Sequence, residues 1–384
     1  MTMTDLIATA RGFHDELKRR AGEIETARRL PADLAKKFGD AGYFRLLVPS
    51  DYGGLESDPL TFARLVETLA EADGSTAWVA MICASTGTTA SWIPPAGARE
   101  IFARPEAIVC GVFARRGKAH DEGDHYRVEG RWQWGSGSDI SDWMTAGCVL
   151  YRDGKPVMDE AEMPVNGSIF APTHEIELQG NWDTSGLCGS GSQDFVMRDV
   201  RVPKSRAEIG KFKIYIERPL YFFPPFGLLA CGIASVMMGL ARASIRELTA
   251  IASVKIPEAH RRVLAQRART QEDIAEAEAL LRSGRAFFRE MMEMAWSETR
   301  ANGHAAVETR RDLRLAVTHA ARSSVRAVDL MYNLGGGTSV YKTSPLQRIF
   351  RDIHVASQHM QIATPTMETA GRHMLGLDGD YSQL

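Results

Sequence analysis

The stretch that says most about the fold is GGGTSVY at residues 335–341, followed by SPLQR at 344–348 and by Arg351-Asp352. The glycine run closes one long apolar helix, and a basic turn leads from it into a second helix. Glycine lets a backbone approach a ligand closely, and helix N-termini with arginines attract anionic groups. The stretch therefore suits a planar, phosphate-bearing cofactor. A glycine C-cap followed by a proline-initiated turn explains the same residues without a ligand.

The bulk composition is that of a globular protein with two or three domains. The chain has 384 residues, 44% hydrophobic and 24% charged, with a formal net charge of -2. This near-neutral balance argues against a dedicated nucleic-acid binder or a membrane-surface protein. The five cysteines are widely spread and form no CxxC pair, so we expect no disulfide framework, no metal site and a cytoplasmic location. We also expect no apolar run of transmembrane length.

Hydrophobic periodicity divides the chain into three zones. Residues 1–105 repeat apolar positions at helical spacing. Residues 106–205 change to a period of two, in short runs between Gly, Asp and Ser turns, which predicts a β domain ending near Pro203. Residues 206–384 return to long apolar stripes with polar opposite faces, which predict a helical bundle. The predicted fold class is therefore α+β.

Two segments of the β zone combine small residues with aromatic or hydroxyl groups. They are WQWGSGS at 132–138 and GLCGSGS at 186–192. Small residues beside a large aromatic side chain allow a backbone to approach a flat ring, and a hydroxyl can meet a polar ring edge. A tryptophan in a sheet core and a flexible loop explain the segments equally well. The chain carries no Walker A lysine motif, no Rossmann GxGxxG and no GxSxG elbow.

Zones and motifs together resemble the acyl-CoA dehydrogenase superfamily over essentially the whole chain. The matching elements, in order, are LVPSDYGG at 47–54, WGSG at 134–137, VRVP at 200–203, LGG at 334–336 and Arg351-Asp352. The WGSG segment matches the flavin-binding Trp-x-Thr-Asn strand of the family. The resemblance implies an N-terminal α-helical domain, a central β-barrel or sandwich domain and a C-terminal four-helix bundle.

The carboxylate base of the dehydrogenases is missing from this chain. In the family a glutamate that follows Arg-Asp removes a proton from an acyl-CoA, whereas this chain reads QHMQ at 358–361. The second place that supplies the base in some members, Leu220–Phe223, holds no carboxylate, and Glu217 is more than a helical turn away. An acyl-CoA dehydrogenase-like FAD oxidoreductase is therefore only the alternative function. A non-catalytic scaffold is a third class.

The pattern instead resembles the two-component (group D) flavin-dependent monooxygenases. That group shares a Ser-Gly at the threonine position, a histidine near the lost glutamate, SPLQR at 344–348 and LAQR at 264–267. The resemblance implies an oxygenase component that receives reduced FMN, or FAD, from a separate NAD(P)H:flavin reductase. It also implies reaction with O2 through a flavin C4a-hydroperoxide to oxygenate a small aromatic or heterocyclic substrate. A homotetramer is implied as well.

The resemblance assigns roles to individual residues. The hydroxyl of Ser136 would bond flavin N5, and His359 would orient the hydroperoxide or move its proton, because an imidazole titrates in the working pH range. Arg267 would neutralise the phosphate. The expected flavin contacts are Trp78, Trp134, Ser136, Gly137, Arg267, Gly336, Gly337 and Thr338, of which the last three would reach flavin across a subunit boundary. Trp78 also suits a helix core, Arg267 a solvated surface charge and His359 a structural histidine.

Two further segments bear on the substrate. Several aromatic hydroxylases of the group carry a histidine after the Trp78 element, to help deprotonate a phenol. The matching stretch, Cys83–Gly87, has none, so phenol activation by that route is not expected. The aromatic run Tyr221–Phe226 either lines an apolar, ring-accepting pocket or forms a buried contact between domains.

Overall fold

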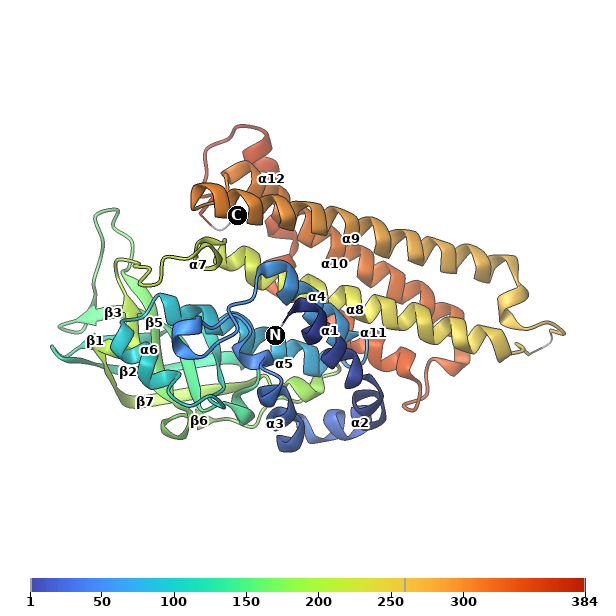
Figure 1. Ribbon diagram of the computed structural model, residues 1–384, viewed down its shortest axis with the longest axis horizontal. Helices are drawn as coiled ribbons and strands as arrows, with labels where there is room; N and C mark the ends of the chain where they lie inside the picture. The colour runs from blue at the N-terminus through green and yellow to red at the C-terminus, as the bar shows by residue number, and fades with distance from the viewer. Residues whose placement is uncertain (1, 259, 383) are drawn as a thin grey trace.

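The N-terminal helices lie between a β-sheet and a bundle of long helices (Figure 1). The computed structural model describes residues 2–258, 260–382 and 384. The sheet occupies one end of the elongated molecule, and the connection between helices α8 (Pro225–Val254) and α9 (Ala268–Asn302) lies at the other end. The predicted α+β class, with helices before and after a central sheet, is confirmed.

The N-terminal region places helix α5 in contact with both other regions. Its helices are α1 (Met3–Gly12), α2 (His14–Ala27), α3 (Ala32–Asp40), α4 (Pro59–Ala70), α5 (Gly74–Thr86) and α6 (Pro95–Ile101). Helix α5 begins at Asp73, whose Oδ1 accepts the backbone N–H of Thr76 at 2.7 Å, a standard N-cap. It is buried along nearly its whole length and packs against β1 and α8. Its side chains therefore reach the junction between the sheet and the bundle.

The described strands form one continuous eight-stranded sheet. They are β1 (Val109–Asp121), β2 (His125–Gly135), β3 (Trp143–Arg152), β4 (Lys155–Pro156), β5 (Asn166–Pro172), β6 (Glu177–Leu178), β7 (Gln193–Pro203) and β8 (Ala207–Ile209). The order is β6-β7-β2-β1-β3-β5-β8, with β4 paired to β3. Strands β1 and β3 are parallel, and the other pairs are antiparallel. The sheet continues past Pro203, because β8 pairs with β5.

Trp132 belongs to the core of the sheet. Its indole Nε1–H donates to the carbonyl oxygen of Gly147 at 2.8 Å, and its ring stacks on Phe195 with centroids 5.2 Å apart. A Cβ at Gly117 would overlap the Trp132 ring, so the neighbouring strand needs glycine there. Trp132 is therefore a tryptophan packed in the sheet core, whereas Trp134 is exposed.

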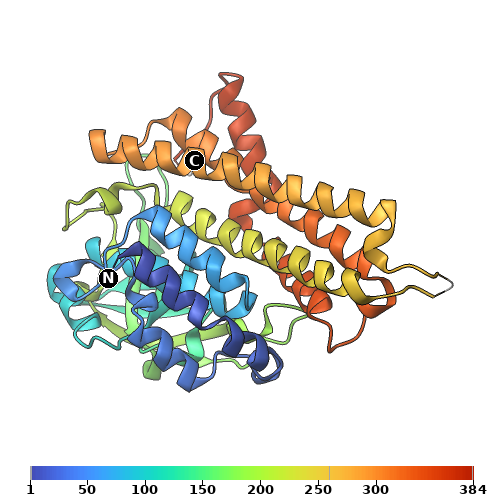
Figure 2. The same cartoon turned by 45° about the vertical axis from the view of Figure 1, so that its right-hand side comes forward.

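Long helices form the C-terminal region. The short α7 (Pro219–Phe222) precedes α8, and α8, α9 and α10 (Val307–Gly335) run side by side (Figure 2). Helices α11 (Pro345–Ala356) and α12 (Thr364–Met374) pack on this group. Small residues allow the close approach: a Cβ at Gly284 of α9 would lie only 3.1 Å from the Cα of Ala320 in α10.

Helix α8 corrects one sequence expectation. Among the described residues it alone is long and apolar enough to cross a membrane, with a mean hydropathy of 1.7 over its most apolar window. However, 89% of that window is buried inside the protein. Helices α4, α5, α10 and α11 cover its apolar surface. The helix therefore lies at the centre of the bundle. A helix in this place is apolar on every face because other parts of the protein pack against every face.

The Arg351-Asp352 pair joins the bundle to the sheet region. Oδ1 of buried Asp352 accepts the backbone N–H of Leu187 at 2.7 Å. Arg351 donates to the carbonyl oxygen of Ser185 and pairs with Glu25 at 2.6 Å. A Cβ at Gly186 would overlap the carbonyl oxygen of Arg351, so glycine allows the loop to lie directly on α11. This loop leads into Ser190 and Ser192.

Asp352 should make the stability of the protein depend on pH. Burial, with the nearby charge of Asp73, raises the pKa of the Asp352 carboxyl to about 7. The folded state therefore holds this proton more tightly than the unfolded state, and the resulting stability is lost as pH rises toward the folded-state pKa. We expect wild-type protein to lose about 2 kcal/mol more free energy of unfolding between pH 5.5 and 8 than Asp352→Asn, which keeps the acceptor for Leu187.

Urea unfolding at several pH values measures this difference. Asp378→Asn, at an exposed position, is the matched control and should follow the wild-type profile. Parallel pH profiles for wild type and Asp352→Asn would contradict the assignment.

Candidate active site

The two Gly/Ser segments singled out in the sequence meet at the end of β2. The backbone N–H of Gly137 donates to the carbonyl oxygen of Ser190 at 2.9 Å. The hydroxyl oxygens of Ser136 and Ser192 lie 2.6 Å apart, and those of Ser192 and Ser190 lie 2.7 Å apart. All three serines are buried. Their hydroxyls form a continuous hydrogen-bonded row.

Trp78 of α5 extends this row from the helical side. Its Nε1–H donates to the hydroxyl oxygen of Ser136 at 3.1 Å, although the two residues lie far apart in sequence. Because the indole nitrogen can only donate, Ser136 keeps its own proton free for Ser192 or for a ligand. A buried hydroxyl that can change its hydrogen-bond partner is suited to bind a polar atom of a flat ring.

Trp134 stands out from the protein beside this row. Its side chain is 65% exposed, and its φ of +67° lies in the left-handed region that non-glycine residues rarely adopt. Gly137 also has a positive φ of +77°, and a Cβ there would lie 3.3 Å from Val79. A large indole next to buried hydroxyls offers an apolar surface on which a flat ring can lie.

His359 also lies beside Trp78. The two ring centroids lie 5.9 Å apart. His359 caps the short helix η10 (Met360–Ile362), and its Nδ1 accepts the backbone N–H of Gln361 at 3.2 Å. An acceptor Nδ1 carries no proton, so the neutral ring holds its proton at Nε2.

The imidazole of His359 does not titrate in the working range, contrary to the sequence expectation. Burial, together with the positive charge of Arg314, lowers its pKa to about 4. Both causes disfavour the imidazolium. His359 is therefore a neutral hydrogen-bond donor at neutral pH rather than a group that gains and loses a proton.

A free carboxylate is missing where the dehydrogenases need one. The buried carboxyls of Asp73 and Asp352, at the start of α5, each already accept a backbone N–H. Glu217 is exposed and precedes α7, which contains no acid. No Asp or Glu contributes to the shifted pKa of His359. None of these three acids is therefore a free carboxylate beside His359.

The remaining predicted residues gather at a different place, around the end of α8. Nζ of Lys255 donates to the carbonyl oxygen of Gly335 at 2.7 Å, and the backbone N–H of Leu264 donates to the carbonyl oxygen of Lys255 at 2.7 Å. These bonds bring the segment that contains Arg267 next to the turn that contains Gly336. In both views this place lies at the end of the bundle away from the sheet (Figures 1 and 2).

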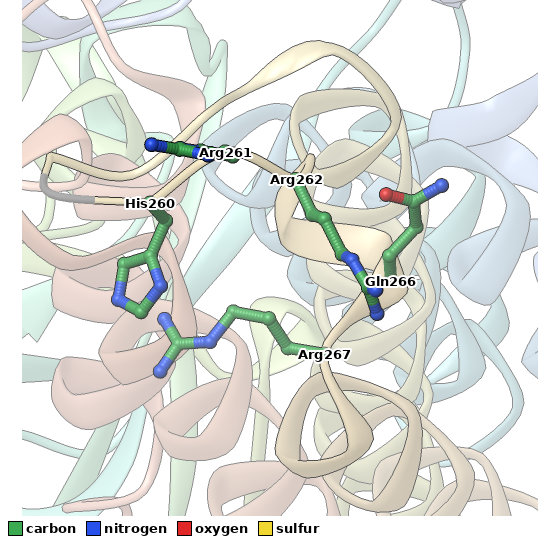
Figure 3. Close-up of a pocket in the computed structure, with 5 residues that line it drawn as sticks. All are labelled: His260, Arg261, Arg262, Gln266 and Arg267. Atoms are coloured by element: carbon green, nitrogen blue, oxygen red, sulfur yellow. The ribbon is translucent and has the colours of Figure 1, made fainter.

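Arg267 lines a strongly basic pocket of about 520 Å³. In Figure 3 the side chains of His260 and Arg267 point toward the same space, and Arg262 extends beside Gln266. Arg261 is the fifth lining residue. These arginines are exposed, and none of them forms an ion pair with a described acidic side chain. Several unneutralised cations around one hollow suit a phosphate group.

The glycine turn beside this pocket presents bare backbone. Gly336 has a φ of +53°, which favours glycine, whereas a Cβ at Gly337 would meet no atom within 4 Å. Packing within the chain thus does not require glycine at 337. Val340 and Tyr341, just beyond Thr338, are 63% and 66% exposed. The turn is suited to close contact with a ligand or with another chain.

These residues fit the two ends of a flavin nucleotide. Trp78, Trp134, Ser136 and Gly137 offer a ring surface with polar contacts, and the basic pocket with its glycine turn offers a phosphate site. No hydrogen bond among the described residues joins the two groups within one chain. The sequence identified eight of these positions but assigned no role to Ser190, Ser192 or Arg314. The repeated Gly-Ser signal marked the serines, whereas Arg314 resembles a solvated helix arginine.

Comparison with known proteins identifies the relatives of the chain. The family model "Acyl-CoA dehydrogenase, N-terminal domain" matches residues 3–100, and "Acyl-CoA dehydrogenase, C-terminal domain" matches residues 231–364. An indole-3-acetate monooxygenase of Pseudomonas putida is 33% identical over 93% of this chain and 90% of its own length. The FADH2-dependent resorcinol hydroxylase oxygenase component of a Rhizobium species is 26% identical over 98% of this chain and 96% of its own length.

A solved structure agrees over its full length. The HsaA monooxygenase of Mycobacterium tuberculosis superimposes with a TM-score of 0.89, at 26% identity, covering 100% of both chains. These three relatives are thus named as monooxygenases or as the oxygenase component of a hydroxylase, which favours the oxygenase function over the dehydrogenase alternative.

The protonation state of His359 is open to direct measurement. In histidine-labelled protein, we expect its NMR signals to remain those of a neutral ring with the proton at Nε2 from pH 8 down to pH 5, because its pKa is about 4. Loss of the signals in His359→Gln assigns them. A titration midpoint between pH 6 and 7 would contradict the burial argument.

Proposed function

The chain belongs to the acyl-CoA dehydrogenase family, in its branch of flavin-dependent monooxygenases, and we propose how its residues carry out that activity. It is an oxygenase component that uses reduced flavin and O2. For its substrate we propose a small aromatic compound. Indole-3-acetate is the first candidate, because a relative with that substrate in its name is 33% identical to this chain.

The monooxygenase function is best supported by the residue that stands at the place of the dehydrogenase base. At the place of the dehydrogenase base the chain has His359, a neutral ring with its proton at Nε2, and the nearby carboxylates are already hydrogen-bonded. Removing a proton from an acyl thioester needs a free base matched to that acid. A neutral donor instead suits a reaction in which a bound oxygen species must be held by a hydrogen bond.

We propose that the flavin ring lies beside Trp134, with Ser136 and Gly137 at its polar edge. Reduced flavin supplies the electrons that activate O2. The hydroxyl of Ser136 is held at Trp78 Nε1, and its oxygen would accept a hydrogen bond from the N5–H of reduced flavin. Arg267 and its basic neighbours would hold the phosphate, with Gly336, Gly337 and Thr338 alongside. FMN remains our expectation, and the FADH2-dependent relative makes FADH2 the necessary comparison.

His359 would act by position and by its fixed tautomer. Gln361 holds Nδ1, so the proton at Nε2 is available to an oxygen atom near Trp78. Because the ring is neutral at neutral pH, it can donate this hydrogen bond without surrendering the proton to bulk solvent. The buried side chains of Trp78 and Ser136 would exclude water on their side of the reacting atoms, which strengthens the hydrogen bond.

The aromatic run next to α7 divides into two roles. Tyr221 and Phe223 are buried, with exposed fractions of 2% and 1%, which favours a packing role for both. Phe226 is 37% exposed at the start of α8. We therefore propose Phe226 as the residue of this run that contacts an aromatic substrate.

We propose three further properties for the protein. A separate NAD(P)H:flavin reductase supplies reduced flavin, as the oxygenase-component names of relatives suggest. A homotetramer brings the glycine turn and basic pocket of one chain to the residues around Trp134 and Ser136 of another. Four exposed apolar residues near that turn are suited to a subunit contact: Val254, Ile256, Val340 and Tyr341. A cytoplasmic location suits the five free cysteines.

Isotope labelling tests the reaction itself. Wild-type protein, a flavin reductase, NADH and indole-3-acetate should form a product that contains one oxygen atom from 18O2, whether the flavin is FMN or FAD. Product formation without isotope incorporation would contradict a monooxygenase. Reduction of bound FAD by an acyl-CoA under anaerobic conditions would instead support the dehydrogenase alternative.

His359→Ala should separate flavin binding from productive oxygenation. We expect unchanged affinity for reduced flavin, an increase in hydrogen peroxide release and a fall in product per NADH of about 10-fold, because the positioned Nε2 donor is lost. Peroxide and product are measured together. His319→Ala, at an exposed position on α10, is the control. Unchanged coupling in His359→Ala would remove the residue from the mechanism.

Ser136→Ala should weaken the binding of reduced flavin. The variant loses the hydroxyl and leaves Nε1 of Trp78 without its acceptor, so we expect an affinity loss of about 5- to 10-fold in an anaerobic titration. Ser253→Ala removes an exposed hydroxyl of α8 and should bind flavin as wild type does. Equal affinities for wild type and Ser136→Ala would refute contact between this hydroxyl and the ring.

A further inference from the structure

Arg314 of α10 is a buried cation without a counterion. Its relative exposure is 4%, and its one recorded hydrogen bond runs from Nη1 to the carbonyl oxygen of Phe226 at 3.5 Å. No described Asp or Glu pairs with it. Arg45 provides the contrast: it is 6% exposed, and its guanidinium donates to the carbonyl oxygens of Tyr52, Phe102 and Arg104.

A buried charge of this kind is unfavourable for the free protein. Removing a guanidinium from water is costly unless hydrogen bonds and an opposite charge replace the lost solvation. Burial accordingly lowers the pKa of Arg314. A protein retains such a group where a ligand supplies the missing partner, because functional sites are often locally unfavourable in the absence of ligand.

The position of Arg314 connects it with the candidate active site. It faces the first turns of α8, where Phe226 accepts its hydrogen bond and the thiol of Cys231 is close enough to feel its charge. Helix η10, which His359 caps, packs on both α8 and α10. The charge of Arg314 also reaches the imidazole of His359. Half-exposed Phe226, the cation and the Nε2 donor thus belong to one neighbourhood.

We propose that Arg314 binds the carboxylate of the substrate, so that the enzyme selects small aromatic carboxylic acids. The planar guanidinium offers several donors, and Phe226 occupies only one of them, which leaves a pair for a carboxylate. A carboxylate held there directs the aromatic ring of the same molecule toward Phe226 and His359. This proposal rests on the proposed function and names the substrate class of that site.

Ligand binding without flavin, reductase or turnover tests the proposal. By calorimetry, wild-type protein should bind indole-3-acetate about 30-fold or more tightly than indole-3-acetamide, which has the same shape without the charge. Arg314→Gln should bind the two within about threefold, and its affinity for the amide should match that of wild type. Arg314→Lys, which keeps the charge but loses the planar fork, should fall between them. Arg322→Gln, on the exposed side of the same helix, should keep the wild-type preference.

Thermal unfolding separates a binding role from a structural one. If Arg314 serves the ligand, Arg314→Gln should melt no lower than wild type without ligand, and indole-3-acetate should raise the melting temperature of wild type only. Equal affinity of wild type for acid and amide, equal loss of both ligands in Arg314→Gln, or a lower melting temperature of that variant would each overturn the proposal.

The outcomes also separate carboxylate binding by Arg314 from the proposed oxygenase activity. Carboxylate binding through Arg314 without incorporation of oxygen from 18O2 would retain the binding role and reject the oxygenase activity at this site. Oxygenation of neutral aromatics with no preference for acids would retain the activity and reject the role of Arg314.

Discussion

The hydrogen bond between the buried carboxyl of Asp352 and the backbone N–H of Leu187 connects the bundle to the sheet region. It fixes the loop that carries Ser190 and Ser192 directly on α11, with Gly186 allowing the contact. Because Ser192 lies next to Ser136, the geometry of the hydroxyl row depends on this junction. Helix α5, which begins at Asp73 beside the same carboxyl, adds Trp78 to the row. The buried Asp352 thus helps to position both the loop with Ser190 and Ser192 and the start of α5, which carries Trp78.

The electrostatics of the site differ from those of a dehydrogenase. A dehydrogenase places a carboxylate where this chain places a neutral imidazole, and the charge that this imidazole senses is the cation of Arg314. A positive local potential disfavours protonation of His359 and favours anionic ligands. Burial is the main cause of the neutral imidazole; the same charge adds to it and would also favour an acidic ligand.

Much of the architecture could be predicted from the sequence, because hydrophobic periodicity changes where the helices give way to strands. The motifs at Ser136 and at Arg351-Asp352 pointed to the family. Each is tied to close contacts, since Gly137 packs near Val79 and the Arg351-Asp352 pair binds the Ser185–Leu187 loop. Tertiary surroundings could not be predicted in the same way. The pKa of His359 depends on burial by distant segments, and Arg314 lies among charged neighbours that make it look solvated. The apolar length of helix α8 was underestimated because glycines and alanines interrupt its apolar character without exposing it to water.

The exposed indole of Trp134 gives the protein a built-in optical reporter. Among the described tryptophans it alone stands largely in solvent, whereas Trp78 and Trp132 are enclosed. Its emission should be shifted to long wavelength and be quenched by acrylamide, and any flat molecule that covers it should suppress both properties. Occupancy at the end of β2 can therefore be followed by fluorescence in the unmodified chain.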